Sequence, residues 1–199
     1  MTALADIDLV LASTSRYRRE LLARFTPSFR TLWPHVDESP LPAETPFALA
    51  TRLAAAKADA VATDCPQALI IGSDQVADLD GHTLGKPGVA AIARQQLTAC
   101  SGRSVIFHTA VCLIDTRQRP ARIHAGIDAT HVVFRDLHAD EIAHYIATER
   151  PLDCAGSFKA EGLGIALFER IESSDPTALI GLPLIVLARL LRAAGVAIP

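Results

Sequence analysis

Hydrophobic positions along the chain recur with two different periods, and their alternation predicts an α/β fold. Residues 7–12 (IDLVLA) form a short apolar run that is typical of a buried strand. A serine-rich turn follows, and residues 16–25 (RYRRELLARF) then place apolar side chains at helical spacing. Residues 69–71 (LII) predict another buried strand. A strand, a turn and a helix in this order are typical of α/β proteins.

The same two periods predict the remaining elements. Pro46 opens a long helical pattern, since proline is well tolerated in the first turn of a helix. Helices are predicted over residues 46–62, 88–102, 139–149 and 181–195, an extended segment over 31–40, an antiparallel pair of strands over 103–115 and 122–134, and a glycine-rich loop leading into a strand over 154–173. We therefore predict one α/β domain over residues 1–199, with a central mixed β-sheet flanked by helices and a second half forming a small lobe beside a cleft.

Composition narrows the classes of function. The formal net charge of −3 argues against non-specific nucleic-acid binding. No apolar run reaches the roughly 18 residues of a membrane span, and residues 7–12 lack the basic leader of a signal peptide. The four cysteines and seven histidines show no metal-binding spacing, so we expect reduced thiols in a cytoplasmic protein.

Two stretches of the chain resemble familiar phosphate-binding motifs but do not match them. The stretch from Gly81 to Lys86 resembles a P-loop, but it is one residue too short between the glycines and has Pro87 where Ser or Thr should follow the lysine. Gly162 and Gly164 precede a predicted strand, whereas the glycines of a dinucleotide-binding fingerprint follow one.

The turn after the first strand is a better candidate for an anion site. Its sequence, STSRYRR, begins at Ser13 and places arginines at the start of a predicted helix, where free backbone N–H groups and the helix dipole attract anions. Guanidinium groups bind phosphate through paired hydrogen bonds. The arginines concerned are Arg16, Arg18 and Arg19. The alternative is that Ser15 only caps the helix and the arginines are surface charges.

Lys57 adds a second cation. It projects from the apolar face of its predicted helix, close to Leu53 and Val61. Such a lysine either extends its ammonium to the edge of the core or points into a cleft that needs positive charge.

Carboxylates and a further lysine complete the candidate site. Asp74 follows the strand at 69–71, and ligands of open α/β sheets bind beyond the carboxyl ends of strands. Glu38 could meet it, and Lys86 stands on a stiff loop nearby. Two carboxylates among cations can hold Mg²⁺ or Mn²⁺ against a triphosphate and orient a water. The alternatives are a turn cap at Asp74 and ordinary surface charge at Lys86.

Six blocks of the chain together resemble the Maf family of nucleoside triphosphate pyrophosphatases. In order, they are LVLASTSRYRRELL, VDES, RLAAAKA, LIIGSDQV, LGKP and CAGSFKAEGLGIALFERIESSDPTALIGLPL. The resemblance covers nearly the whole chain and implies an elongated α/β domain with a cleft between two lobes. It also implies attack of water on the α-phosphorus of a nucleotide, with release of diphosphate.

The resemblance assigns roles to individual positions. The family's proton acceptor falls on Asp74, and its other cleft positions fall on Ser13, Arg18, Arg19, Glu38, Lys57 and Lys86. Gln75, with Tyr17 and Glu161, is similar to the branch that acts on 7-methyl-GTP. An aromatic face and a carboxylate favour a cationic methylated guanine. From spacing alone, Tyr17 is instead a core residue and Glu161 a loop charge.

The resemblance leaves two further functions open. One is hydrolysis of other canonical or modified nucleotides, and the other is regulation of septum formation through nucleotide binding. A homodimer is also implied. Arg16 stands where family members often have proline, which either loosens the turn or adds a phosphate contact.

Overall fold

The computed structural model describes residues 2–198 and is built on one large mixed β-sheet, as the sequence predicts. The strand order is β3–β2–β4–β6–β7–β8, with β5 paired to β4. Strands β2, β3 and the start of β4 are parallel, whereas β4 to β8 are antiparallel. The strands are β2 (Asp8–Ala12), β3 (Arg30–Leu32), β4 (Ala68–Leu79), β5 (His82–Leu84), β6 (Ser104–Asp115), β7 (Arg122–Phe134) and β8 (Phe168–Glu172).

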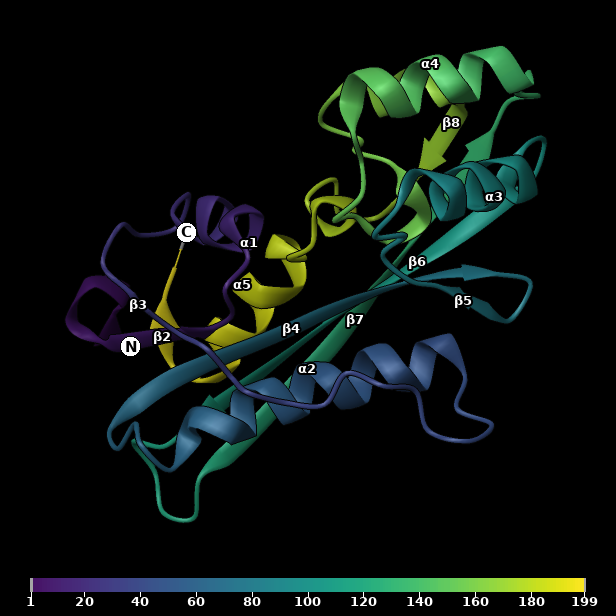
Figure 1. The fold of residues 1–199 in the computed structure, drawn as a ribbon. Coiled ribbons are helices and arrows are strands. Elements are labelled where there is room, and N and C mark those ends of the chain that lie inside the picture. Colours follow the sequence, from purple (N-terminus) through teal and green to yellow (C-terminus); the bar gives the residue numbers. More distant parts are fainter. Residues whose placement is uncertain (1, 199) are drawn as a thin grey trace.

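Helices cover both faces of the sheet, and each predicted helix is present. Figure 1 shows α2 along one face, α1 and α5 near the other, and α3 and α4 at the far end. Their bounds are α1 (Arg16–Leu22), α2 (Pro46–Ala62), α3 (Ala90–Cys100), α4 (Ala139–Glu149) and α5 (Leu184–Ala193). Four 3₁₀ turns are η1 (Leu4–Asp6), η2 (Ala155–Ser157), η3 (Leu163–Leu167) and η4 (Ala178–Ile180). Within residues 2–198, every helix falls short of the length and apolar character that a membrane crossing requires.

Alternation along the strands distributes the core over both faces. In β2, Leu9 and Leu11 pack with α1 and α5, whereas Val10 and Ala12 pack with α2. Successive side chains of a strand point to opposite faces, so this short apolar run is buried on both sides. A third cluster, which includes Phe107, fills the far end beneath α3 and α4. The long strands β4 and β6 contribute to all three clusters.

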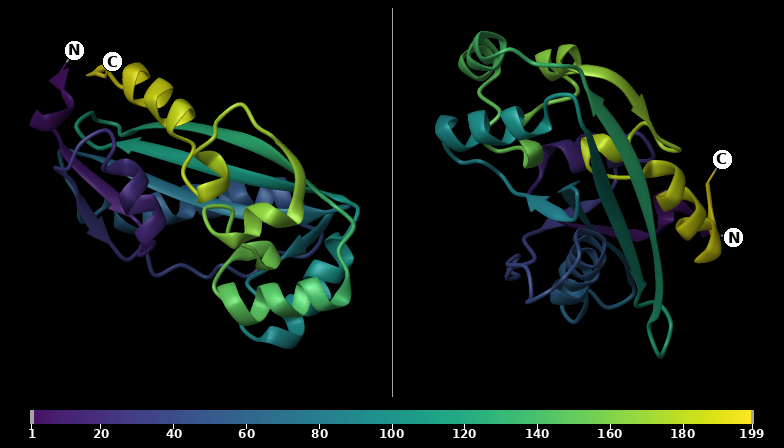
Figure 2. Two further views of the ribbon diagram at one scale, coloured as in Figure 1. Left: turned by 90° about the horizontal axis from the view of Figure 1, so that it is seen from above. Right: turned by 90° about the vertical axis from the view of Figure 1, so that its right-hand side faces the viewer.

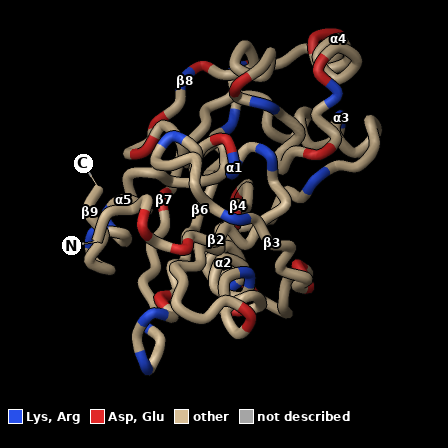
Figure 3. Tube along the Cα trace, turned by 90° about the vertical axis from the view of Figure 1, so that its left-hand side faces the viewer, with Lys and Arg blue, Asp and Glu red and all other residues tan. Residues whose placement is uncertain are grey.

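The two ends of the chain lie side by side. The short strands β1 (Thr2–Ala3) and β9 (Val196–Ala197) pair in parallel. Figure 2 shows both termini at the end of the molecule opposite α3 and α4. Figure 3 shows basic and acidic positions interspersed along the trace, in keeping with the small net charge.

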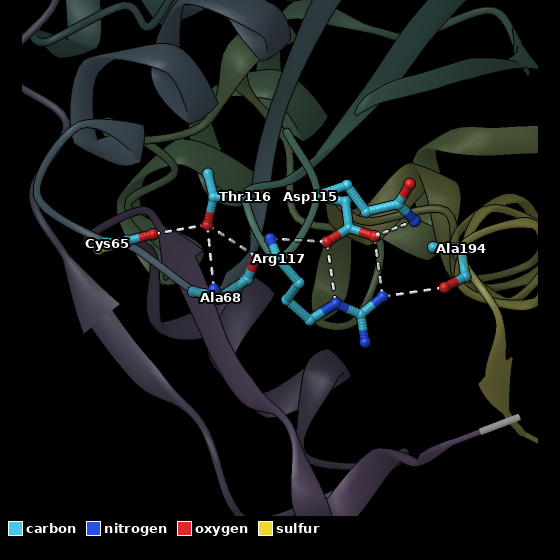
Figure 4. A network of polar contacts seen from close by, with 7 residues as sticks. Cys65, Ala68, Asp115, Thr116, Arg117 and Ala194 are labelled. Atoms are coloured by element: carbon cyan, nitrogen blue, oxygen red, sulfur yellow. Dashed lines mark hydrogen bonds and ion pairs between the residues drawn. The ribbon is translucent and has the colours of Figure 1, made fainter. Parts of the chain in front are cut away.

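A buried ion pair fixes the turn between β6 and β7 (Figure 4). The fully buried Asp115 accepts from Arg117 Nε at 2.8 Å and from Nη2 at 2.9 Å. Arg117 also donates to the carbonyl oxygen of Ala194, at the end of α5, at 2.9 Å. The neighbouring Thr116 hydroxyl donates to the carbonyl oxygen of Cys65 at 2.7 Å. This network joins three segments that are distant in the sequence.

Candidate active site

Asp74 lies in a gap along one edge of β4. On this edge β2 pairs with β4 only as far as Gly72, and β5 begins to pair at Ala77. On the other edge β6 pairs without interruption and places Ala110 opposite Asp74. The predicted end of the strand at Ile71 is therefore wrong, because pairing with β6 carries the strand through its polar residues. Asp74 does lie beyond the carboxyl end of a parallel strand, but that strand is β2.

A close helix–strand crossing brings Lys57 to Asp74. A Cβ atom at Gly72 would lie 2.2 Å from the carbonyl oxygen of Ala54 and 2.6 Å from the amide nitrogen of Ala58, so only glycine allows α2 to approach this closely. Lys57 stands between these two alanines, and its Nζ donates to Asp74 Oδ1 at 2.6 Å. Lys57 is buried and lines a cavity, which supports the cleft alternative over an ammonium at the edge of the core.

Glu38 shares the same ammonium group. Its Oε1 lies 2.6 Å from Lys57 Nζ, on the side of the lysine that faces the 33–40 segment. Burial raises the pKa of Glu38, but Lys57, Lys86 and Arg18 together outweigh it, and the net pKa lies below the usual range. The two carboxylates predicted to meet therefore do meet, around a cation.

Arg18, in the first turn of α1, lines the cavity. Ser15 caps α1, since its hydroxyl accepts from the amide of Arg18 at 3.4 Å, as the simpler alternative predicts. The Arg18 side chain nevertheless lines the cavity and donates from Nε to the carbonyl oxygen of Gly181 at 2.8 Å. Burial lowers the pKa of Arg18, and the charges of Asp74 and Glu38 oppose that shift. Capping and a role in the cavity therefore coexist in this turn.

Three further predicted residues have different positions. Ser13 is buried, lines the cavity and accepts from the amide of Ser15 at 3.1 Å. Lys86 is exposed and lines the cavity. Arg19 is exposed and is not among the lining residues, because the helical turn separates it from Arg18.

The cavity has a volume of about 690 Å³, within the range typical of small-molecule sites. It is lined by residues from the start of α1, the 33–40 segment, α2, β4, the β5 loop and the segments around 153–161 and 179–181. Nine of the predicted site residues line it: Ser13, Tyr17, Arg18, Glu38, Lys57, Asp74, Gln75, Lys86 and Glu161.

Gln75 is held by a loop that the sequence analysis did not connect to the site. Its Nε2 donates to the carbonyl oxygens of Ala178 and Leu179, both at 2.9 Å. Two carbonyl partners fix the amide orientation, so Oε1 is the atom that can accept from a base. The buried Ser73 and Thr109 hydroxyls bind Gly181 O and Ala178 O of the same loop.

Asp175 shapes this loop and was also missed. It is buried, and its Oδ1 accepts from the amide of Thr177 at 2.9 Å. Its Oδ2 accepts from the amide of Ile185 at 2.6 Å, in the first turn of α5. The Asp-Pro-Thr sequence at 175–177 is a turn signal that could have indicated this role.

Arg16 covers the aromatic ring to which the resemblance assigns base binding. The guanidinium carbon lies 4.7 Å from the centroid of the Tyr17 ring, and Nη2 donates to the Tyr17 hydroxyl at 3.1 Å. Tyr17 is half-buried at the cavity, so it is not the core residue that helical spacing alone predicts. An arginine in place of proline therefore adds a cation to the rim of the cavity.

Two more cavity residues escaped the sequence analysis. Trp33 is 65% exposed and its ring stacks near that of His35, with centroids 3.9 Å apart. Asp153 is exposed and lines the cavity, as does the predicted Glu161. The one tryptophan of the sequence, inside the extended segment predicted over residues 31–40, was the only signal for Trp33, and no pattern marked Asp153.

Two of the carboxylates that line the cavity, Glu38 and Asp74, lie close enough together to be candidate metal ligands. Among residues 2–198, no group of three or more His, Cys, Asp or Glu side chains converges as a metal site. Glu38 and Asp74 converge on one point, which suits an ion that takes one or two carboxylates and completes its shell with substrate phosphates. The residues present therefore fit Mg²⁺ bound together with a triphosphate.

Comparison with known proteins identifies the family of the chain. The family model for Maf-like proteins matches residues 8–194. The chain belongs to the Maf-like family. This confirms the resemblance of its sequence blocks.

Curated relatives are similar over almost the full length of this Maf-like chain. A protein of Xanthomonas oryzae pv. oryzae is 60% identical over 96% of this chain and 98% of its own length, and bears the name 7-methyl-GTP pyrophosphatase. Proteins with the same name from Aromatoleum aromaticum and Burkholderia thailandensis are 55% and 56% identical, over 96% and 94% of this chain and 97% and 87% of theirs.

A solved structure shows the same fold. The Staphylococcus aureus Ham1 protein superposes with a TM-score of 0.54 and 12% identity, covering 94% of this chain and 99% of that one. At that identity the likeness concerns the fold alone, and it agrees with the central mixed sheet and flanking helices predicted from the sequence.

Proposed function

We propose that this Maf-like protein is a nucleoside triphosphate pyrophosphatase that hydrolyses 7-methyl-GTP to 7-methyl-GMP and diphosphate. The name of the relatives that match nearly the whole chain supports the substrate. The observation that carries the reaction is that Asp74 faces Lys57 in a cavity also lined by Arg18 and Lys86. A carboxylate at a cluster of cations suits phosphoryl chemistry, which depends on positioning and charge stabilisation.

Asp74 is the proposed base. Its Oδ1 is held by Lys57, and we assign Oδ2 to the attacking water. The water oxygen bonds to the α-phosphorus, its proton goes to Asp74, and the bond from that phosphorus to the bridging oxygen breaks. Diphosphate leaves with the bonding electron pair. Arg18, Lys57 and Lys86 neutralise the charge that develops on it.

A divalent cation is part of the proposal. Glu38 and Asp74 would hold Mg²⁺ or Mn²⁺ on the triphosphate, where such an ion supplies charge neutralisation. Glu161 and Tyr17 are the proposed contacts of the methylated base. The predicted role of Arg19 in substrate binding stays a prediction, since Arg19 does not line the cavity. A homodimer and a cytoplasmic location also stay predictions.

A substrate panel tests the function. Diphosphate release from 7-methyl-GTP, GTP, dTTP and UTP is measured with Mg²⁺ or Mn²⁺ and after chelation. We expect release to be fastest with 7-methyl-GTP and to stop on chelation. A faster reaction with another nucleotide would replace the proposed substrate. Binding of 7-methyl-GTP without release would instead support the regulatory alternative.

A further inference from the structure

One side chain outside the cavity joins two of its walls. Gln96 of α3 is not a lining residue, but its Nε2 donates to the carbonyl oxygen of Gly85 at 3.1 Å. Its Oε1 accepts from the hydroxyl of Ser157. Gly85 directly precedes Lys86, and Ser157 directly precedes Phe158, and both of these neighbours line the cavity.

The polar character of this position needs an explanation. Gln96 stands among Ala93, Leu97 and Cys100 on the face of α3 that packs into the core, where the helical period predicts an apolar residue. The Gln96 amide donates one hydrogen bond to the Gly85 carbonyl and accepts one from the Ser157 hydroxyl, so both partners are satisfied. The Ser157 hydroxyl belongs to a fully buried residue, so its partner matters for stability as well.

The bridge acts on the loop that carries Lys86. Lys86 is exposed, and Gly85 has open space around it. Besides Gln96, a backbone bond from the amide of Gly88 to the carbonyl oxygen of Leu152, at 3.0 Å, connects the same two segments. On the other bridged segment, the Phe158 ring lies against that of Phe107, with centroids 5.1 Å apart. A shift of either wall is therefore transmitted to the other through Gln96.

We propose that Gln96 is a positioning residue that couples the phosphate-binding cation Lys86 to the Ser157–Phe158 wall. The proposal rests on the proposed function, since it assigns Lys86 to the departing diphosphate. Gln96 touches no substrate. It sets the position of the Lys86 backbone. When substrate fills the cavity and contacts the Phe158 wall, the bridge through Gln96 holds that backbone in place for the reaction.

A double-mutant cycle tests the coupling. Gln96→Glu keeps an acceptor for Ser157 but cannot donate to the Gly85 carbonyl, so it breaks one link selectively. We expect kcat/KM for 7-methyl-GTP and the affinity for inorganic diphosphate with Mg²⁺ to fall about three- to tenfold, the usual effect of one hydrogen bond. In a Lys86→Ala background the same change should have almost no further effect, because the two residues act as a unit.

Controls separate coupling from general destabilisation. Gln95→Glu places the same charge on the exposed side of α3 and should behave like the wild type. Ser157→Ala removes the hydrogen bond between Ser157 and Gln96. It should lower kcat/KM in the wild type but have almost no effect in the Lys86→Ala background. This variant keeps the test possible if the Gln96 variant fails to fold. Equal losses with and without Lys86, or no loss at all, would overturn the proposal.

The cycle also distinguishes this proposal from the proposed function. If the wild type bound diphosphate and the cycle showed coupling, but 7-methyl-GTP were not hydrolysed, only the proposed function would fail. If 7-methyl-GTP were hydrolysed and the effects of Gln96 and Lys86 were additive, only the positioning role would fail.

Discussion

Gly72 of β4 and Ala54 of α2 approach so closely that a Cβ at position 72 would lie 2.2 Å from the Ala54 carbonyl oxygen. This contact sets the height of α2 above the sheet, and with it the 2.6 Å hydrogen bond between Lys57 and Asp74. A residue with no functional group of its own therefore determines the geometry of the proposed base.

Gly72→Ala should lower both stability and activity. The added methyl group meets backbone atoms, which cannot rotate away, so α2 must move outward. Overpacking of this kind costs about 1–3 kcal/mol of unfolding free energy. Because Lys57 moves with α2, kcat/KM should fall further than the stability change explains. Urea unfolding and diphosphate release measure the two effects, and a wild-type value for both would contradict the account.

Lys57→Met should destabilise the fold through the charges it leaves behind. Asp74 would stay buried without its cation, at a cost of about 3 kcal/mol. Lys57→Met combined with Asp74→Asn removes both charges, so it should regain much of the stability but none of the turnover. Unfolding curves for the single and double variants decide this. A double variant no more stable than Lys57→Met would argue that the pair contributes little.

Glu161→Gln should reduce the preference for the methylated base. The neutral amide loses the attraction to a cationic ring, and charge-assisted hydrogen bonds contribute about 1.5–3 kcal/mol. The ratio of kcat/KM for 7-methyl-GTP over GTP should therefore fall by about ten- to a hundredfold. Glu169→Gln, on the exposed strand β8, is the matched control and should leave the ratio unchanged. If Glu161→Gln also left it unchanged, Glu161 would not contact the base.

The free energy of unfolding should decrease at acidic pH because Asp115 becomes protonated. Hydrogen bonds from Arg117 hold the pKa of this carboxyl below its usual range. Because the folded pKa lies below that of the unfolded chain, the stabilisation is complete above about pH 4 and is lost as the pH falls through the folded value.

Asp115→Asn provides the test of that pH dependence. The gap in unfolding free energy between wild type and variant should be about 3 kcal/mol at pH 7 and should shrink toward pH 3. Urea unfolding at the two pH values measures it. A gap of equal size at both would show that the Asp115 charge does not contribute in this way.

Much of the architecture follows from local sequence. Helical periods predict α2 and α4 with their ends, because each has a clear apolar face. Pro46 marks the start of α2, and Pro151 follows the end of α4. The extent of β4 does not follow, since residues 73–79 contain two aspartates and a glutamine. These polar side chains are compatible with a strand only because partners from other elements bind them.

The charged residues of the candidate site are predicted better than the groups that hold them in position. Lys57 and Asp74 stand out because each is a charge in an apolar context. By contrast, Ala178 and Leu179 bind Gln75 through backbone carbonyl groups, which leave no trace in the side-chain pattern. Arg18 and Arg19 look equivalent in the sequence, and only the direction of the helical turn separates them.

The most direct test of the central claim is single-turnover hydrolysis of 7-methyl-GTP by the wild type and by Asp74→Asn. Asparagine keeps an acceptor for Lys57 but cannot take a proton from water. The account predicts that turnover falls by on the order of a hundredfold or more while the variant still folds. Near-normal turnover in the folded variant would show that Asp74 is not the base and would contradict the account.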